Sequence, residues 1–217
     1  MIALSLSLIL VALALSLPLT WVCRRAAGRL GQLDQPGHRK IHDRPIPVTG
    51  GVAIFWAAAV PMLAAIAAAW WLPTSLWESL APAALEHLPG VRQQTGMGLT
   101  LVGCLAGLHL VGVIDDRKSL GPFLKLIVQI IAAAALAVFF DVRLLTLLGG
   151  PLSIAVTVLW FVTITNAFNF LDNMDGLSGG VATICAAILL ACALLSGQWF
   201  VAAAAAQLSG ALLGFLW

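Results

Sequence analysis

Charged residues are scarce in this sequence. Asp, Glu, Lys and Arg make up 9% of its 217 residues, while 61% are hydrophobic and the mean hydropathy is +1.04. Soluble domains carry about 25% charged residues, so this composition excludes an ordinary soluble globular protein. Long polar linkers and internal repeats are missing from the sequence as well. We therefore expect a single integral membrane domain over residues 1–217.

Cysteine is also rare. No CxxC pair occurs, and each of the four cysteines lies in or beside an apolar stretch: Cys23, Cys104, Cys185 and Cys192. This pattern gives little support to a disulfide framework or to a zinc site. We interpret the four cysteines as packing residues.

Apolar stretches dominate what is present, and seven of them are close to the length of about 20 residues that a membrane-spanning helix requires. They cover approximately residues 1–22, 51–72, 97–114, 122–140, 151–168, 180–196 and 199–217. No Lys or Arg precedes the first stretch, whereas Arg24 and Arg25 follow it, which is not typical of a cleavable signal peptide. The sequence thus predicts an all-α, polytopic transmembrane helix bundle whose first span is a retained anchor.

Positive charge is distributed unevenly among the predicted loops. Nine of the eleven Lys and Arg residues lie in the first and third loops, and two lie in the second and fourth. The positive-inside rule therefore assigns the odd-numbered loops to the cytoplasm and the N-terminus to the outside. The fifth loop has no Lys or Arg, but counting the crossings places it on the cytoplasmic side too.

The first loop combines basic residues with Pro and Gly. Within residues 34–51, the Pro and Gly residues make a continuous helix unfavourable. Taken alone, Arg39 and Lys40 are typical of topogenic charges near lipid headgroups. His38 and His42 have i,i+4 spacing, but outside a helix this spacing does not bring two imidazoles together on a metal.

Two adjacent carboxylates end the third predicted span. Asp115 and Asp116 precede Arg117 and Lys118. At a helix C-terminus, the helix dipole disfavours a negative charge by about 0.3–1 kcal/mol. Pairing with Arg117 and Lys118 at the membrane surface is one explanation. The other is functional, because adjacent aspartates that face the cytosol are suited to a divalent cation bound to phosphates.

The fifth loop, residues 166–180, holds five Asn or Asp residues. If this segment is helical, Asn169, Asp172 and Asp175 share one face at i,i+3 spacing. The two carboxylates would then repel each other by about 0.2–0.5 kcal/mol, so a cation should compensate them. Capping of the following helix is the alternative, although capping requires one such residue rather than five.

Together, the three odd-numbered loops place two acidic clusters and one basic segment on one face of the membrane. This combination predicts a site for an anionic substrate held through magnesium. It favours phosphoryl transfer, which requires mainly positioning and charge neutralisation. A membrane transporter with a polar site at the cytoplasmic face is the alternative, but transporters hold their polar residues near the bilayer midplane.

In this order, the loops resemble the motifs of the polyprenyl-phosphate N-acetylhexosamine 1-phosphate transferases of glycosyltransferase family 4, specifically the undecaprenyl-phosphate N-acetylglucosamine 1-phosphate branch. Three segments carry the resemblance: Asp34-Gln-Pro with Arg39-Lys40-x-His42 and Gly50-Gly51, the Asp115-Asp116 pair, and Asn166-x-x-Asn169-x-x-Asp172-x-x-Asp175-Gly-Leu. Asn173 departs from the family pattern, which usually has Gly at this position. The Asp-Gly-x-x-Ala-Arg pattern of the CDP-alcohol phosphotransferases is absent after Asp175.

The resemblance implies a reaction in which UDP-N-acetylhexosamine and undecaprenyl phosphate give a lipid diphosphosugar and UMP, as the first membrane step of a cell-envelope glycan pathway. It implies catalytic roles for Asp115 and Asp116. It also implies that Asn169 and Asp116 bind a metal, Mg²⁺ or alternatively Mn²⁺. The substrate-binding residues that it implies are Lys40, His42, Lys125, Asp172 and Asp175.

The resemblance further implies a multi-pass protein of the bacterial inner membrane, surrounded by membrane lipid, with its active site at the cytoplasmic face. No nucleic-acid partner is expected, and a homodimer stays open. Family members continue for several more spans, with a Gly-Asp-x-Gly-Ser segment and a further basic loop. We therefore expect residues 1–217 to be roughly the N-terminal two thirds of such an enzyme and to be inactive alone.

Overall fold

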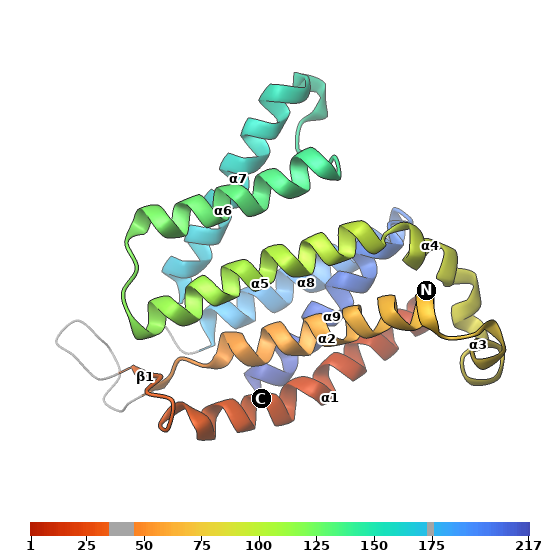
Figure 1. The fold of residues 1–217 in the computed structure, drawn as a ribbon, viewed down its shortest axis with the longest axis horizontal. Coiled ribbons are helices and arrows are strands. Elements are labelled where there is room, and N and C mark those ends of the chain that lie inside the picture. Colours follow the sequence, from red (N-terminus) through yellow and green to blue (C-terminus); the bar gives the residue numbers. More distant parts are fainter. Residues whose placement is uncertain (35–45, 173–175) are drawn as a thin grey trace. The chain divides into compact units, whose positions relative to one another are not determined.

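The computed structural model describes residues 1–34, 46–172 and 176–217, and helices make up most of it (Figure 1). Seven helices in this part of the chain are long and apolar enough to cross a membrane: α1 (Ile2–Ala27), α2 (Gly50–Trp71), α5 (Thr95–Arg117), α6 (Pro122–Phe139), α7 (Gly150–Leu171), α8 (Leu177–Leu195) and α9 (Trp199–Leu216). Each coincides with one predicted span. The prediction of an all-α protein with seven spans is therefore confirmed.

The remaining elements are short. The second loop, residues 73–96, forms three helical segments: α3 (Thr74–Leu80), the 3-10 helix η1 (Pro82–His87) and α4 (Leu88–Gln93). A further 3-10 turn, η2 (Thr146–Leu148), lies between α6 and α7. Two antiparallel two-residue strands, β1 (Leu33–Asp34) and β2 (Ile46–Pro47), pair the two ends of the first loop.

Packing divides the chain into two compact units. The first comprises Met1–Gly98 and Gly179–Trp217, and the second comprises Leu99–Ser178. The expectation of one membrane domain over residues 1–217 stays a prediction.

Small residues allow α9 to pack closely against α1 in the first unit. A Cβ atom at Gly210 would clash with the carbonyl oxygen of Ile9, and one at Gly214 would lie 2.6 Å from Cβ of Ser16. The hydroxyl of Ser16 donates a hydrogen bond of 2.6 Å to the carbonyl oxygen of Ala211. Small residues four positions apart and a buried hydroxyl are typical means of joining helices within a membrane.

The second unit contains most of α5 together with α6 and α7. Consecutive helices α6 and α7 pack against each other, and the thiol of Cys104 on α5 lies 3.7 Å from the carbonyl oxygen of Ala132 on α6. Two residues of α7 hold the backbone of Leu144 in the α6–α7 connection: the hydroxyl of Ser153 donates a hydrogen bond to the Leu144 carbonyl oxygen, and the hydroxyl oxygen of Thr157 accepts one from the Leu144 N–H. This three-helix unit carries the polar residues considered next.

Candidate active site

The carboxylate of Asp115 is held by two hydrogen bonds at the end of α5. One oxygen accepts a hydrogen bond of 2.7 Å from Nζ of Lys125, and the other accepts one of 2.7 Å from the backbone N–H of Leu120. The first contact is also an ion pair, in which the side chains of Lys125 and Asp115 are 33% and 26% exposed. Lys125 therefore offsets the negative charge that the helix dipole disfavours, and both groups stay accessible from outside the unit.

Pairing of the two aspartates with Arg117 and Lys118 was one of the two explanations that the sequence left open. Asp115 pairs with Lys125, which lies beyond the turn, in the first part of α6. The resemblance assigned Lys125 to substrate phosphates. The structure adds that Lys125 is positioned by Asp115.

The polar residues after the fifth span lie largely within a helix. Asn166 and Asn169 belong to α7, which ends at Leu171, and Asp172 is its C-cap residue. The sequence left open whether this segment is helical, and its first part, as far as Leu171, is helical because the backbone continues to form helical hydrogen bonds beyond the apolar stretch. Asn169 and Asp172 are exposed.

A pair of side-chain amides links α6 to α7. Nδ2 of Asn166 donates a hydrogen bond of 2.8 Å to Oε1 of Gln129, and a second one of 2.8 Å to the carbonyl oxygen of Val162. Gln129 is only 8% exposed. A polar side chain at this depth of an apolar helix is costly unless it has a partner, so the pair defines how the two helices align.

The amide pair also brings the predicted site residues to one end of the unit. Lys125 precedes Gln129 by about one helical turn, and Asn169 follows Asn166 by about one turn. Since α6 and α7 run in opposite directions (Figure 1), Lys125 and Asn169 lie toward the same end. The ion pair adds Asp115 to that end. Asp115, Asp116, Lys125, Asn169 and Asp172 are named the α5–α7 polar cluster below.

Three predicted site residues lie outside the described residues. They are Lys40, His42 and Asp175, and Asn173 lies outside them too. Within residues 1–34, 46–172 and 176–217, no three His, Cys, Asp or Glu side chains gather as metal ligands. The predicted roles of the site residues stay predictions.

Replacing Gln129 by leucine tests the amide pair. We expect the variant to lower the free energy of unfolding by about 1 kcal/mol, because the Nδ2 group of Asn166 loses its partner on α6. Unfolding in mixed micelles with increasing SDS measures this change. A double-mutant cycle with Asn166→Leu should give a coupling energy of similar size, and a coupling energy near zero would contradict the proposed link.

The fold defines a multi-pass membrane protein, with acidic and basic side chains gathered toward one end of three spans. Residues 98–217 match the family model described as glycosyl transferase family 4. The match covers more than half of the chain and contains the whole α5–α7 polar cluster, and the chain belongs to this family.

Several relatives of known name are similar to the chain. A Bacillus subtilis protein, named as a probable undecaprenyl-phosphate N-acetylglucosaminyl 1-phosphate transferase, is 29% identical over 208 residues, which are 92% of this chain and 51% of that protein. The decaprenyl-phosphate N-acetylglucosaminephosphotransferase of Mycobacterium tuberculosis is 34% identical over 173 residues, which are 75% of this chain and 39% of that protein. The chain thus spans about half the length of these relatives, or less. No solved structure gives a significant match.

Proposed function

We propose that the chain belongs to an enzyme that transfers N-acetylhexosamine 1-phosphate from a UDP-sugar to undecaprenyl phosphate, giving a lipid diphosphosugar and UMP. The observation that carries the proposal is the family match over residues 98–217, which includes every residue of the α5–α7 polar cluster. The names of the relatives support a polyprenyl phosphate acceptor and an N-acetylglucosamine donor. The transporter alternative finds no support in these similarities.

In this reaction, an oxygen of the lipid phosphate forms a bond to the β-phosphorus of the UDP-sugar. The bond between that phosphorus and the bridging oxygen breaks, and its electron pair leaves with UMP. The attacking phosphate loses its proton, and a carboxylate at the end of α5 is the acceptor that the cluster offers. Asp115 and Asp116 are the two carboxylates that we propose for this step, and the hydrogen bond from Lys125 to Asp115 adds the positioning of Lys125 to the role of Asp115.

The positive end of Lys125 is the group that the cluster offers to the phosphate oxygens. Phosphoryl transfer concentrates negative charge on these oxygens, and a preorganised ammonium group stabilises that charge better than water does. The hydrogen bond to Asp115 fixes the ammonium group before substrate arrives. This fixed position reduces the reorganisation that the reaction needs.

A divalent metal fits the chemistry of the donor set. Asp116, Asn169 and Asp172 offer carboxylate and amide oxygens, which are the hard ligands that Mg²⁺ prefers and that Mn²⁺ accepts. Asn169 and Asp172 are exposed at the same end of the unit. A bound metal would neutralise charge on the diphosphate. Asn169 and Asp116 are the residues that we propose as its ligands.

Transfer of radiolabelled sugar phosphate from UDP-N-acetylglucosamine to undecaprenyl phosphate tests the function directly. We expect the full-length gene product to form a labelled lipid and UMP in equal amounts, and expect EDTA to abolish both. If added Mg²⁺ or Mn²⁺ then restores formation of both products, the result would support a role for a divalent metal in the reaction. Hydrolysis to UMP without labelled lipid would contradict the proposed acceptor.

We also propose that the site faces the cytoplasm at the bacterial inner membrane, since nine of the eleven Lys and Arg residues lie in loops one and three. After replacement of the native cysteines, a thiol probe that cannot cross the inner membrane should label Ser75→Cys in intact cells but not Ser119→Cys. Ser75 lies in α3, within the second loop, and Ser119 follows α5. Labelling of Ser119→Cys in intact cells would reverse the proposed orientation.

A further inference from the structure

A phenylalanine in the last turn of α9 lies between the first turns of two other helices. The phenylalanine is Phe215, and its neighbours are Gly50, the first residue of α2, and Gly179, the third residue of α8. All three residues belong to the first unit. Gly50 is part of a motif that carries the family resemblance, yet the reaction proposed above assigns it no role.

The two glycines lie at opposite edges of the Phe215 ring. A Cβ atom at Gly50 would overlap Cε2 of the ring and would lie 3.0 Å from Cζ and 3.3 Å from Cδ2. A Cβ atom at Gly179 would lie 3.3 Å from Cε1 and 3.5 Å from Cδ1, which form the other edge, and 3.1 Å from Cδ2 of Leu216. A side chain at position 50 would therefore press the ring toward the backbone of α8.

The ring accounts for glycine at these two positions and not at their neighbours. Each glycine is followed by a second one, Gly51 in α2 and Gly180 in α8. A Cβ atom at either of these would meet no atom of the described residues within 4 Å. Because glycine is a poor helix former, the start of a helix alone does not favour it. The close approach of the two backbones to one ring does.

The contact joins the two helices that follow the first and the fifth loop. In the sequence, Lys40 and His42 precede α2, and Asp175 precedes α8. The family resemblance assigns these three residues to substrate binding. A ring packed between two backbones limits how far the two helix starts can separate. Since binding costs free energy for every group that it must order, helix starts that are already fixed favour binding.

We propose that Phe215 is a positioning residue for binding of the UDP-sugar, an inference that rests on the function proposed above. The ring fixes the starts of α2 and α8 to each other, so that less has to be ordered when the nucleotide diphosphate binds. The groups proposed for proton transfer and metal binding, Asp115, Asp116 and Asn169, belong to the second unit and take no part in this contact. Loss of the contact therefore weakens binding of the UDP-sugar and leaves the chemical step largely unchanged.

Steady-state kinetics of the full-length gene product test the proposal. Gly50→Ala should raise the KM for UDP-N-acetylglucosamine about tenfold and change kcat less than about twofold, because binding is lost and the reacting groups stay in place. Gly51→Ala and Gly180→Ala are the matched controls, since their added methyl groups have room, and they should keep the native KM. Phe215→Leu should raise KM about threefold, and adding Gly50→Ala to it should raise KM no further, because the smaller side chain leaves space for the methyl group.

Distances between two spin labels test the contact without catalysis. After replacement of the native cysteines, labels at Gly51→Cys and Gly180→Cys report the separation of the two helix starts. We expect a narrow distance distribution that becomes broader in Phe215→Leu and in Gly50→Ala. An unchanged distribution, a fall in kcat at the native KM, or an equal rise in KM in the control variants would each overturn the proposal. Absence of labelled lipid with the native protein would instead contradict the proposed function, and the distances would still decide whether the ring fixes the two helices.

Discussion

Replacement of Asp116 by asparagine is expected to lower the rate of sugar-phosphate transfer by the full-length gene product at least about a hundredfold. The reason is that Asp116 carries one of the two adjacent carboxylates at the end of α5 that we propose for proton transfer, and that we also propose it as a metal ligand. Asp115, the other carboxylate, accepts hydrogen bonds from Lys125 and Leu120. Asparagine keeps the size of the side chain and removes its basicity.

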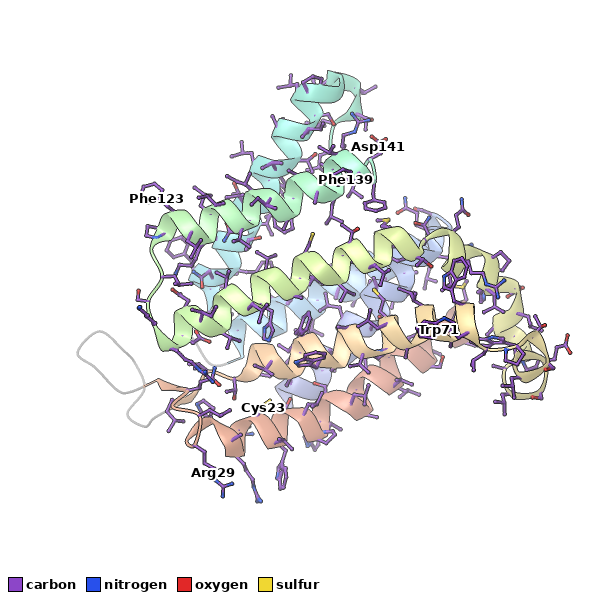
Figure 2. All side chains as sticks on the ribbon, in the orientation of Figure 1. Cys23, Arg29, Trp71, Phe123, Phe139 and Asp141 are labelled. Carbon is purple, nitrogen blue, oxygen red and sulfur yellow. The ribbon has the colours of Figure 1, made fainter. Side chains whose placement is uncertain are left out.

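The measurement is the initial rate of lipid labelling, compared with the amount of folded protein. Asp141→Asn is a suitable control. Asp141 lies beyond the opposite end of α6 from the polar cluster (Figure 2) and has a φ of 57°, which asparagine adopts readily. The control should keep near-normal transfer. Normal transfer by a folded Asp116→Asn variant would assign the second aspartate of the pair to structure instead of chemistry.

The seven spans could be predicted because their signal is local. A run of about 20 apolar residues is readable in the sequence without knowledge of any contact. The helices nevertheless extend beyond these runs, to Ala27 in α1, Arg117 in α5 and Leu171 in α7. A helix continues into the polar region because its backbone groups keep their own hydrogen bonds there. Hydropathy therefore located the spans better than it located their polar ends.

The contacts of the candidate site could be predicted only in part. The sequence indicated Asp115, Asp116 and Asn169 by their residue types, but it did not indicate that Lys125 pairs with Asp115. That pairing depends on how the turn after α5 folds back, which residue spacing does not encode. Gln129 was missed altogether. Its signal was available, since a glutamine inside an apolar span is costly without a partner and often marks a constrained position.

Lys125 is the residue for which stability and catalysis can be separated. We expect Lys125→Gln to lower the rate of transfer at least about a hundredfold, because a preorganised positive charge is lost from the phosphate site. We also expect a loss of about 1 kcal/mol in the free energy of unfolding, because the carboxylate of Asp115 stays at a helix C-terminus without its cation. Lys125→Arg keeps the charge, so it should stay folded and retain most of the ion pair.

The double variant Asp115→Asn/Lys125→Gln distinguishes the two effects. Two neutral amides can still form the hydrogen bond between α5 and α6, and the amide oxygen introduced at position 115 would still accept from the backbone N–H of Leu120. Neither charge is then left unpaired, so the free energy of unfolding should return to within about 0.5 kcal/mol of the native value. The rate of transfer should stay as low as in Lys125→Gln, because the phosphate site still lacks its cation. If transfer recovered together with stability, the Asp115–Lys125 pair would be a structural link between two spans, and the cation for the phosphates would have to come from another residue.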